Sequence, residues 1–157
     1  MNVFQKTLTL VLATTSIAAL TTTVMAEEKK SPEAMAIEYR QSAFEMIKYH
    51  FGPMAAMVKG DKEFNAAEFV KNAESVATLS KFPIHGFIEG SDKGAKTEAK
   101  ATIWSNRADF DKKMETFQVE AAALAEVAKG GDLAAIKPQF GKVGESCKAC
   151  HKEYKED

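Results

Sequence analysis

The spacing of the apolar residues constrains the fold of this chain most strongly. In the first long stretch after residue 30 the apolar residues Ile37, Phe44, Ile47 and Phe51 are separated by seven, three and four positions. Intervals of three, four and seven place side chains on one face of a helix. No stretch alternates apolar and polar residues with period two, as a half-buried strand would. The pattern therefore predicts an all-α protein.

Glycine, proline and capping residues divide this pattern into four helical stretches. The first starts at Ser31 and Pro32, because serine caps a helix N-terminus and proline is tolerated in the first turn; it stops at Gly60. We expect Gly52-Pro53 to bend or interrupt this helix, since a proline inside a helix removes one backbone hydrogen bond.

A long loop separates the second and third stretches. The second starts at Asn65, with Glu68 in the position of a capping box, and ends before Pro83. Residues 82–95 are rich in glycine and have no periodicity, so they predict a loop. The third stretch runs over about 97–129 and is stopped by two glycines.

The fourth stretch begins with Asp132 as N-cap, and we expect Pro138 to kink or restart it. Four helices joined mostly by short turns predict an antiparallel four-helix bundle, formed by residues 27–157 as one domain. The chain has 21 basic and 22 acidic side chains, and this near balance argues against a nucleic-acid-binding protein.

The N-terminal segment has the features of a secretory signal peptide. Lys6 precedes a stretch without charge that extends from residue 7 to Ala26, and the stretch ends in the small-x-small sequence Val24-Met25-Ala26. This pattern predicts cleavage after Ala26, export of residues 27–157 and, in a Gram-negative bacterium, a periplasmic location. The alternative is an uncleaved membrane anchor, which the many threonines of the stretch disfavour.

Both cysteines of the chain lie in the sequence Cys147-Lys148-Ala149-Cys150-His151. C-x-x-C-H is the attachment sequence of c-type haem. Residues three apart on a helix face the same side, so one helix turn can present both thiols to the two vinyl groups of a porphyrin. His151, four residues after the first cysteine, points the same way and can ligate the iron. The motif predicts one covalently attached haem c per chain.

Three other interpretations of the cysteines are open. A thioredoxin-like redox pair needs a βαβ context, which the sequence lacks. A structural zinc site needs four ligands, and only His50 and His85 remain as further candidates, neither with paired spacing. The third alternative is an incidental surface pair.

The complete pattern resembles the class II cytochromes c, and specifically the cytochrome c′ family, over essentially the whole exported chain. The resemblance is carried by four segments, of which the last is the most specific: Tyr39-Arg40-Gln41-Ser42-Ala43, His50-Phe51-Gly52-Pro53-Met54, Ile103-Trp104 and Phe140-Gly141-Lys142-Val143-Gly144-Glu145-Ser146-Cys147-Lys148-Ala149-Cys150-His151. It implies an exported haem protein, usually a homodimer, with high-spin iron held by a single axial histidine.

The resemblance also implies roles for individual residues. Cys147 and Cys150 would be the thioether anchors and His151 the axial ligand. Arg40, which pairs with a haem propionate in the family, and Gln41 would contact the haem; the alternative for each is a solvated helix surface.

Two further parts of the site match the family less closely. The family stretch T-x-A-K-P before Ile103 reads Thr97-Glu98-Ala99-Lys100-Ala101 here, without the proline, so Thr97 and Glu98 are weaker candidates for haem contact. Lys155, four after His151, is expected beside the proximal haem face where relatives often carry arginine; the alternative is a surface lysine.

Phe44 decides the expected mechanism. It shares one helix face with Arg40 and Gln41, so if these two touch the haem edge, Phe44 should stand over the ring. The resemblance implies that this position blocks the sixth coordination site; the alternative is an ordinary core phenylalanine. Low-spin relatives place a ligating methionine in the first helix, but Met46 points about 200° away from Phe44. The other candidates lie too early in the helix or beyond the Gly-Pro pair: Met35, Met54 and Met57.

These features predict five-coordinate iron that binds NO and CO in an apolar pocket, carries single electrons, or does both. The alternative is a six-coordinate low-spin protein that acts purely as an electron carrier. A peroxidase would need a distal histidine or arginine as acid–base group, so Phe44 argues against an enzyme.

Overall fold

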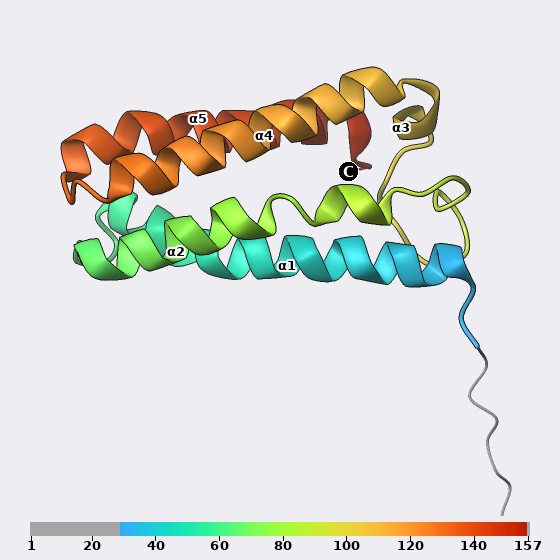
Figure 1. Ribbon diagram of the computed structural model, residues 1–157, viewed down its shortest axis with the longest axis horizontal. Coiled ribbons are helices and arrows are strands. Elements are labelled where there is room, and N and C mark those ends of the chain that lie inside the picture. Colours follow the sequence, from blue (N-terminus) through green and yellow to red (C-terminus); the bar gives the residue numbers. More distant parts are fainter. Residues whose placement is uncertain (1–28, 157) are drawn as a thin grey trace, which may run out of the picture.

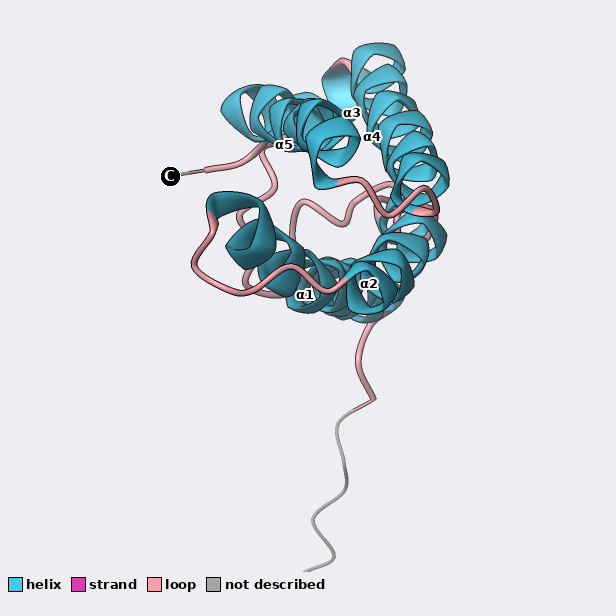
Figure 2. Cartoon of the chain, turned by 90° about the vertical axis from the view of Figure 1, so that its left-hand side faces the viewer, coloured by secondary structure: helices cyan, strands magenta, loops and turns pink. Residues whose placement is uncertain are grey.

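The computed structural model describes residues 29–156, which form one helical bundle. Its elements are α1 (Pro32–Lys59), α2 (Ala66–Leu79), η1 (Pro83–Gly86), α3 (Thr102–Ser105), α4 (Arg107–Ala128) and α5 (Leu133–Tyr154). The four long helices run antiparallel to their sequence neighbours, with α1 against α2 and α4 against α5 (Figure 1). Seen end-on, the two pairs face each other (Figure 2). The prediction of an all-α antiparallel four-helix bundle is confirmed.

The structure leaves the N-terminal prediction untested. The predicted signal peptide, residues 1–26, lies outside the described residues. None of the helices in residues 29–156 combines the length and the apolarity needed to span a membrane. The described part of the chain contains no strand, only an isolated bridge between Ala99 and Lys155.

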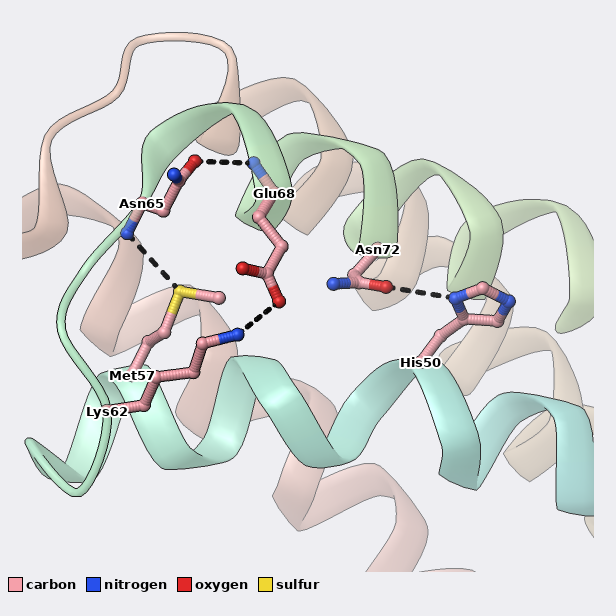
Figure 3. Close-up of polar contacts among 6 residues, drawn as sticks. All are labelled: His50, Met57, Lys62, Asn65, Glu68 and Asn72. Atoms are coloured by element: carbon pink, nitrogen blue, oxygen red, sulfur yellow. Dashed lines mark hydrogen bonds and ion pairs between the residues drawn. The ribbon is translucent and has the colours of Figure 1, made fainter.

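The helix starts follow the predicted caps. The side chains of Ser31, Asn65 and Asp132 accept hydrogen bonds from backbone N–H groups two or three residues later, at 3.2, 2.9 and 2.9 Å. The capping box at Asn65 is only half formed, because the Glu68 carboxylate pairs with Lys62 instead (Figure 3). The Asn65 N–H donates to the Met57 sulfur at 3.5 Å, which ties the start of α2 to the end of α1.

The interruption expected at Pro53 and the restart expected at Pro138 are wrong, whereas the bend or kink expected there stays a prediction. Helix α1 continues through Pro53, and α5 continues through Pro138 without a restart. A proline in a helix interior costs about 3 kcal/mol. Beyond Pro53, however, Met54 and Met57 are fully buried, and each such side chain stabilises the fold by about 1.5–3 kcal/mol. Burial of the continued helix therefore offsets the lost hydrogen bond.

The predicted start of the third helix, at about residue 97, is also wrong. Residues 97–101 are not helical, and Asn106, with φ −127° and ψ 48°, separates α3 from α4. The backbone before α3 instead pairs with the end of α5: the Lys100 N–H donates to the Tyr154 carbonyl at 3.0 Å, and the Glu156 N–H to the Glu98 carbonyl at 2.7 Å. We call residues 96–100 the strap. The predicted 82–95 loop contains the short helix η1.

Two clusters of buried apolar side chains form the core of the bundle, and the predicted haem site lies between them. The larger cluster joins α1, α2, α4 and α5 around residues such as Phe69, Leu124 and Val143. The smaller one groups Phe87 and Phe110 with three further buried residues, Ile103, Met114 and Tyr154. Phe44 packs against both clusters. The site is therefore enclosed by packed side chains from elements distant in sequence.

Candidate cofactor-binding site

A cavity of about 1080 Å³ lies between α1, α4, α5 and the strap. This volume is at the upper end of the range for pockets that hold small molecules and cofactors. All nine residues that the sequence singled out line it: Arg40, Gln41, Phe44, Thr97, Glu98, Cys147, Cys150, His151 and Lys155. The structure thus brings together candidates from α1, from the strap and from the end of α5.

Helix α5 presents two thiols and an imidazole to this cavity within one turn and a half. Both cysteines are free and half-buried. Burial raises the pKa of Cys150 to about 11 and also raises the pKa of Cys147, so both are neutral thiols near neutral pH. Burial, aided by the nearby Lys155 charge, lowers the pKa of His151. Its imidazole is then neutral and has a lone pair available for a metal.

Arg40 is buried in the cavity wall, with only 2% of its surface exposed. Its Nη1 donates to the Gly86 carbonyl at 2.7 Å and to Ser91 Oγ at 2.8 Å. Its Nη2 donates to the Ser91 carbonyl and to Thr97 Oγ1, both at 2.8 Å. The guanidinium also lies 4.6 Å from the centre of the Phe87 ring. A solvated surface role for Arg40 is therefore excluded.

The buried charge of Arg40 has no anionic partner among the residues that the structure describes; the ion pairs found there all involve other side chains. Burial lowers the Arg40 pKa. A buried charge is costly unless it is paired. A cation in the wall of an open cavity is suited to a ligand that brings its own carboxylate.

The strap connects the two sides of the cavity. On the α1 side, Gln41 Nε2 donates to the Lys96 carbonyl at 3.0 Å, next to the contact between Arg40 and Thr97. On the α5 side, Lys155 Nζ lies 2.8 Å from Glu98 Oε2, and this contact lowers the pKa of Glu98. Five residues that the sequence predicted at the haem thus belong to one connection across the cavity edge: Arg40, Gln41, Thr97, Glu98 and Lys155.

The remaining wall is apolar. Phe44 is half-buried, and its ring packs edge-on against Phe87 with 6.5 Å between the centroids. Further apolar side chains from α1, α3 and α4 complete this wall: Ile47, Phe51, Ile103, Phe110, Met114 and Phe117. In the described chain, the lining histidine is His151, whereas His50 Nδ1 instead contacts Asn72 Oδ1 at 2.9 Å, outside the cavity (Figure 3).

Sequence reasoning missed Phe87 and Met114. Phe87 lies in a loop without periodicity, so no pattern marked it. Met114 belongs to the apolar stripe of α4, but periodicity does not distinguish a residue that faces core from one that faces a cavity. Trp104 is half-buried; it packs against the smaller cluster and donates from Nε1 to the Ile88 carbonyl at 2.8 Å.

The residues present fit a haem of the c type. Two thiols and a neutral imidazole lie close together on one helix. The buried Arg40 can pair with a carboxylate of the cofactor. The apolar wall encloses a volume large enough for a cofactor. No three His, Cys, Asp or Glu side chains among the described residues are grouped to hold a bare metal ion. The fold and the site together define a helical-bundle haem protein.

Comparison with known proteins gives the family. The family model described as Cytochrome C′ matches residues 35–155, and the chain belongs to this family. It is 46% identical to the cytochrome c′ of Rubrivivax gelatinosus over 121 residues, which cover 77% of this chain and 94% of that protein. The family carries covalently bound haem c, and so does this protein.

Solved structures agree with this assignment. The cytochrome c prime of Shewanella frigidimarina is 55% identical, with a TM-score of 0.78 over 82% of this chain and 100% of the other. Two variants of the Alcaligenes xylosoxidans protein, solved with nitric oxide and with carbon monoxide, are each 37% identical, with TM-scores of 0.75 and 0.74. These alignments cover 82% of this chain and all of each variant.

Proposed function

We propose that the protein is an exported haem protein in which Cys147 and Cys150 form the thioether bonds and His151 is the axial iron ligand. When bound, the haem supplies an iron that takes up one small ligand and exchanges one electron. Arg40 offers its buried charge to a haem carboxylate, and Gln41 joins it on the α1 side. Thr97 and Glu98 of the strap line the same edge of the cavity, and so does Lys155 at the end of α5.

The observation that carries the function is the apolar character of the wall around Phe44. Phe44 would cover the face of the haem opposite His151, which would keep the iron five-coordinate and high-spin, and its side chain has no hydrogen-bond donor for a bound ligand. A pocket of this kind favours small neutral diatomics over anions. The nitric oxide and carbon monoxide complexes of the Alcaligenes xylosoxidans variants support these two gases as ligands.

We further propose that the protein is not an enzyme. A peroxidase needs an acid–base group beside the ligand. Arg40 is the arginine of the cavity wall, and both of its terminal nitrogens are held by the backbone and by hydroxyl groups. It is therefore not free to move a proton at the iron.

The location and the assembly complete the proposal. The signal-like sequence before Glu27 supports export to the periplasm, with residues 27–157 as the mature protein. N-terminal sequencing of the secreted protein should begin at Glu27; an intact Met1 would contradict cleavage. A homodimer is supported by exposed apolar side chains on α1, and its test is given below.

Optical spectra of the reduced protein test the coordination state. We expect a high-spin spectrum that shifts when CO or NO is added. A low-spin spectrum unchanged by CO would instead support the six-coordinate electron carrier. Met114 would then be the methionine to examine, because it lines the cavity whereas Met35, Met46, Met54 and Met57 do not. The Met114→Leu variant should keep the high-spin spectrum of the wild type if the iron is five-coordinate.

A further inference from the structure

The outer surface of α5 carries a stripe of lysines beside the haem-binding motif. Lys137, Lys148 and Lys152 are exposed and follow one another at intervals of eleven and four residues, which places them on one face of the helix. We call these three residues the lysine face. Lys148 lies between the two cysteines, and Lys152 directly follows His151.

The lysine face is not neutralised by neighbouring acids. Within residues 29–156, no carboxylate lies within ion-pair distance of any of the four lysines of α5, which are the lysine face and the exposed Lys142. Lysines elsewhere do form such pairs, for example Lys129 with Glu126 at 2.6 Å. The ammonium groups of the lysine face are therefore exposed and not held in ion pairs.

This positive charge is local. Helix α5 has four lysines and two glutamates, whereas the adjoining α4 has three basic and five acidic residues. The whole chain has a formal charge of −1. The helix that holds the haem is thus basic in a protein that is slightly acidic overall. Its positive charge attracts an approaching anionic molecule to this side of the protein.

The lysine face also lies beside the three residues of α5 that would hold the haem. Cys147, Cys150 and His151 line the cavity, and His151 is exposed at its mouth. Lys148 lies within one helix turn of all three residues, and Lys152 lies within one turn of Cys150 and His151. A protein that docks here would be held by charge next to the residues that would hold the haem.

We propose that the lysine face is the docking surface for an acidic one-electron redox protein. This inference rests on the electron exchange in the proposed function. Complementary charge mainly raises the rate of encounter and fixes orientation, and it does so most strongly at low salt. In the exchange one electron passes between the haem iron and the partner's redox centre, and no atom or proton is transferred.

Two small complexes of opposite charge test the proposal on the haem-loaded protein. Hexacyanoferrate(III), an anion, oxidises the ferrous protein and becomes hexacyanoferrate(II). Hexaammineruthenium(II), a cation, reduces the ferric protein and becomes hexaammineruthenium(III). In the Lys148→Glu/Lys152→Glu variant we expect the first rate to fall on the order of tenfold at low ionic strength and the second to rise. Both effects should fade at high salt.

The matched control is Lys71→Glu/Lys112→Glu, which makes the same change in net charge at exposed positions on α2 and α4 outside the cavity lining. It should change either rate much less. Equal effects of both variants, or slowing with both reagents in the lysine-face variant, would overturn the docking surface. A wild type that reacts with neither reagent would overturn electron exchange itself, while the CO spectrum tests gas binding separately.

Binding without electron transfer gives an independent measurement. In the diamagnetic CO complex of the ferrous protein, hexacyanochromate(III), a paramagnetic anion, should broaden the backbone amide signals of Lys148 and Lys152 more than those of Lys71 and Lys112. Uniform broadening over these four positions would contradict a localised docking surface.

Discussion

At the scale of single residues, Arg40 connects more parts of the site than any other side chain described above. Two backbone carbonyls and two hydroxyl groups from residues 86–97 receive hydrogen bonds from its guanidinium. The same group packs on Phe87, which in turn contacts Phe44. Arg40 thus holds the loop, the strap and the apolar wall in place before any ligand enters.

Replacing Arg40 by Met should lower the free energy of unfolding by about 2–4 kcal/mol, because the buried carbonyls of Gly86 and Ser91 lose their donor. Urea unfolding of the haem-loaded protein measures this. Arg107→Met is the control: Arg107 also donates to a carbonyl, that of Phe87, but 42% of its side chain is exposed, so we expect a smaller loss. Equal losses would mean that the buried hydrogen bonds of Arg40 are not what stabilises the loop.

Replacing Phe44 by Ala tests its assignment as the cap over the iron. We expect faster CO association to the ferrous protein, on the order of tenfold, since steric access to the distal pocket limits ligand entry. Stopped-flow mixing with CO measures the rate. Phe64→Ala is the matched control, because Phe64 packs against the large core cluster and does not line the cavity. Unchanged kinetics in Phe44→Ala would remove this residue from the distal site.

At the scale of secondary-structure elements, one glycine sets how closely η1 approaches α1. A Cβ added at Gly86 would lie 2.6 Å from the Ala36 carbonyl oxygen and 2.7 Å from Arg40 Cβ. Backbone atoms cannot yield as a flexible side chain can. The close approach also brings the Gly86 carbonyl within hydrogen-bond distance of Arg40.

Gly86→Ala should therefore destabilise the protein by about 1–3 kcal/mol, as overpacking does. Gly141→Ala provides the opposite case in the same protein. Gly141 lies in the exposed part of α5 with nothing within 4 Å of an added Cβ, so alanine should stabilise the helix by about 0.5–1 kcal/mol. Thermal unfolding of the two variants measures the loss of stability in Gly86→Ala and the gain in Gly141→Ala. A neutral Gly86→Ala would show that η1 can move away from α1 without cost.

The elements also show which parts of the fold the sequence could predict. Helix starts at Ser31, Asn65 and Asp132 were predictable because a cap depends on residues two or three positions away. The strap was not, because the backbone groups that pair with it lie more than 50 residues later, at the end of α5. The continuation through Pro53 was missed for a related reason: burial beyond the proline is a property of the packed bundle.

The same distinction holds for the site. The cysteine pair with its histidine, and Arg40 with Gln41 and Phe44, were predictable because each group lies on one helix face. Their convergence on one cavity was expected from the family resemblance and follows from the bundle. Phe87 could not be predicted, since only the position of Gly86 against α1 brings it beneath the Arg40 guanidinium.

At the scale of the whole molecule, the outer face of α1 is unusually apolar for an exposed surface. Met35, Tyr39, Met46 and Tyr49 recur at helical intervals and are 50%, 44%, 47% and 77% exposed. Contiguous apolar surface of this kind marks a protein–protein contact more often than bare solvent-exposed surface. A second copy can cover it with the identical face about a two-fold axis, as most homodimers do.

We therefore expect the wild type to have the mass of a dimer and the Met46→Lys/Tyr49→Lys variant, at the same concentration, to have the mass of a monomer. Two buried, unpaired lysines on each side of a two-fold contact would repel each other and lose hydration. Light scattering after size-exclusion chromatography measures the molar mass, which we expect to halve. Val119→Lys is the control, since Val119 on α4 is 58% exposed but lies apart from this face in sequence and element. If the α1 variant keeps the wild-type mass, or if Val119→Lys halves it, the dimer contact is not on α1.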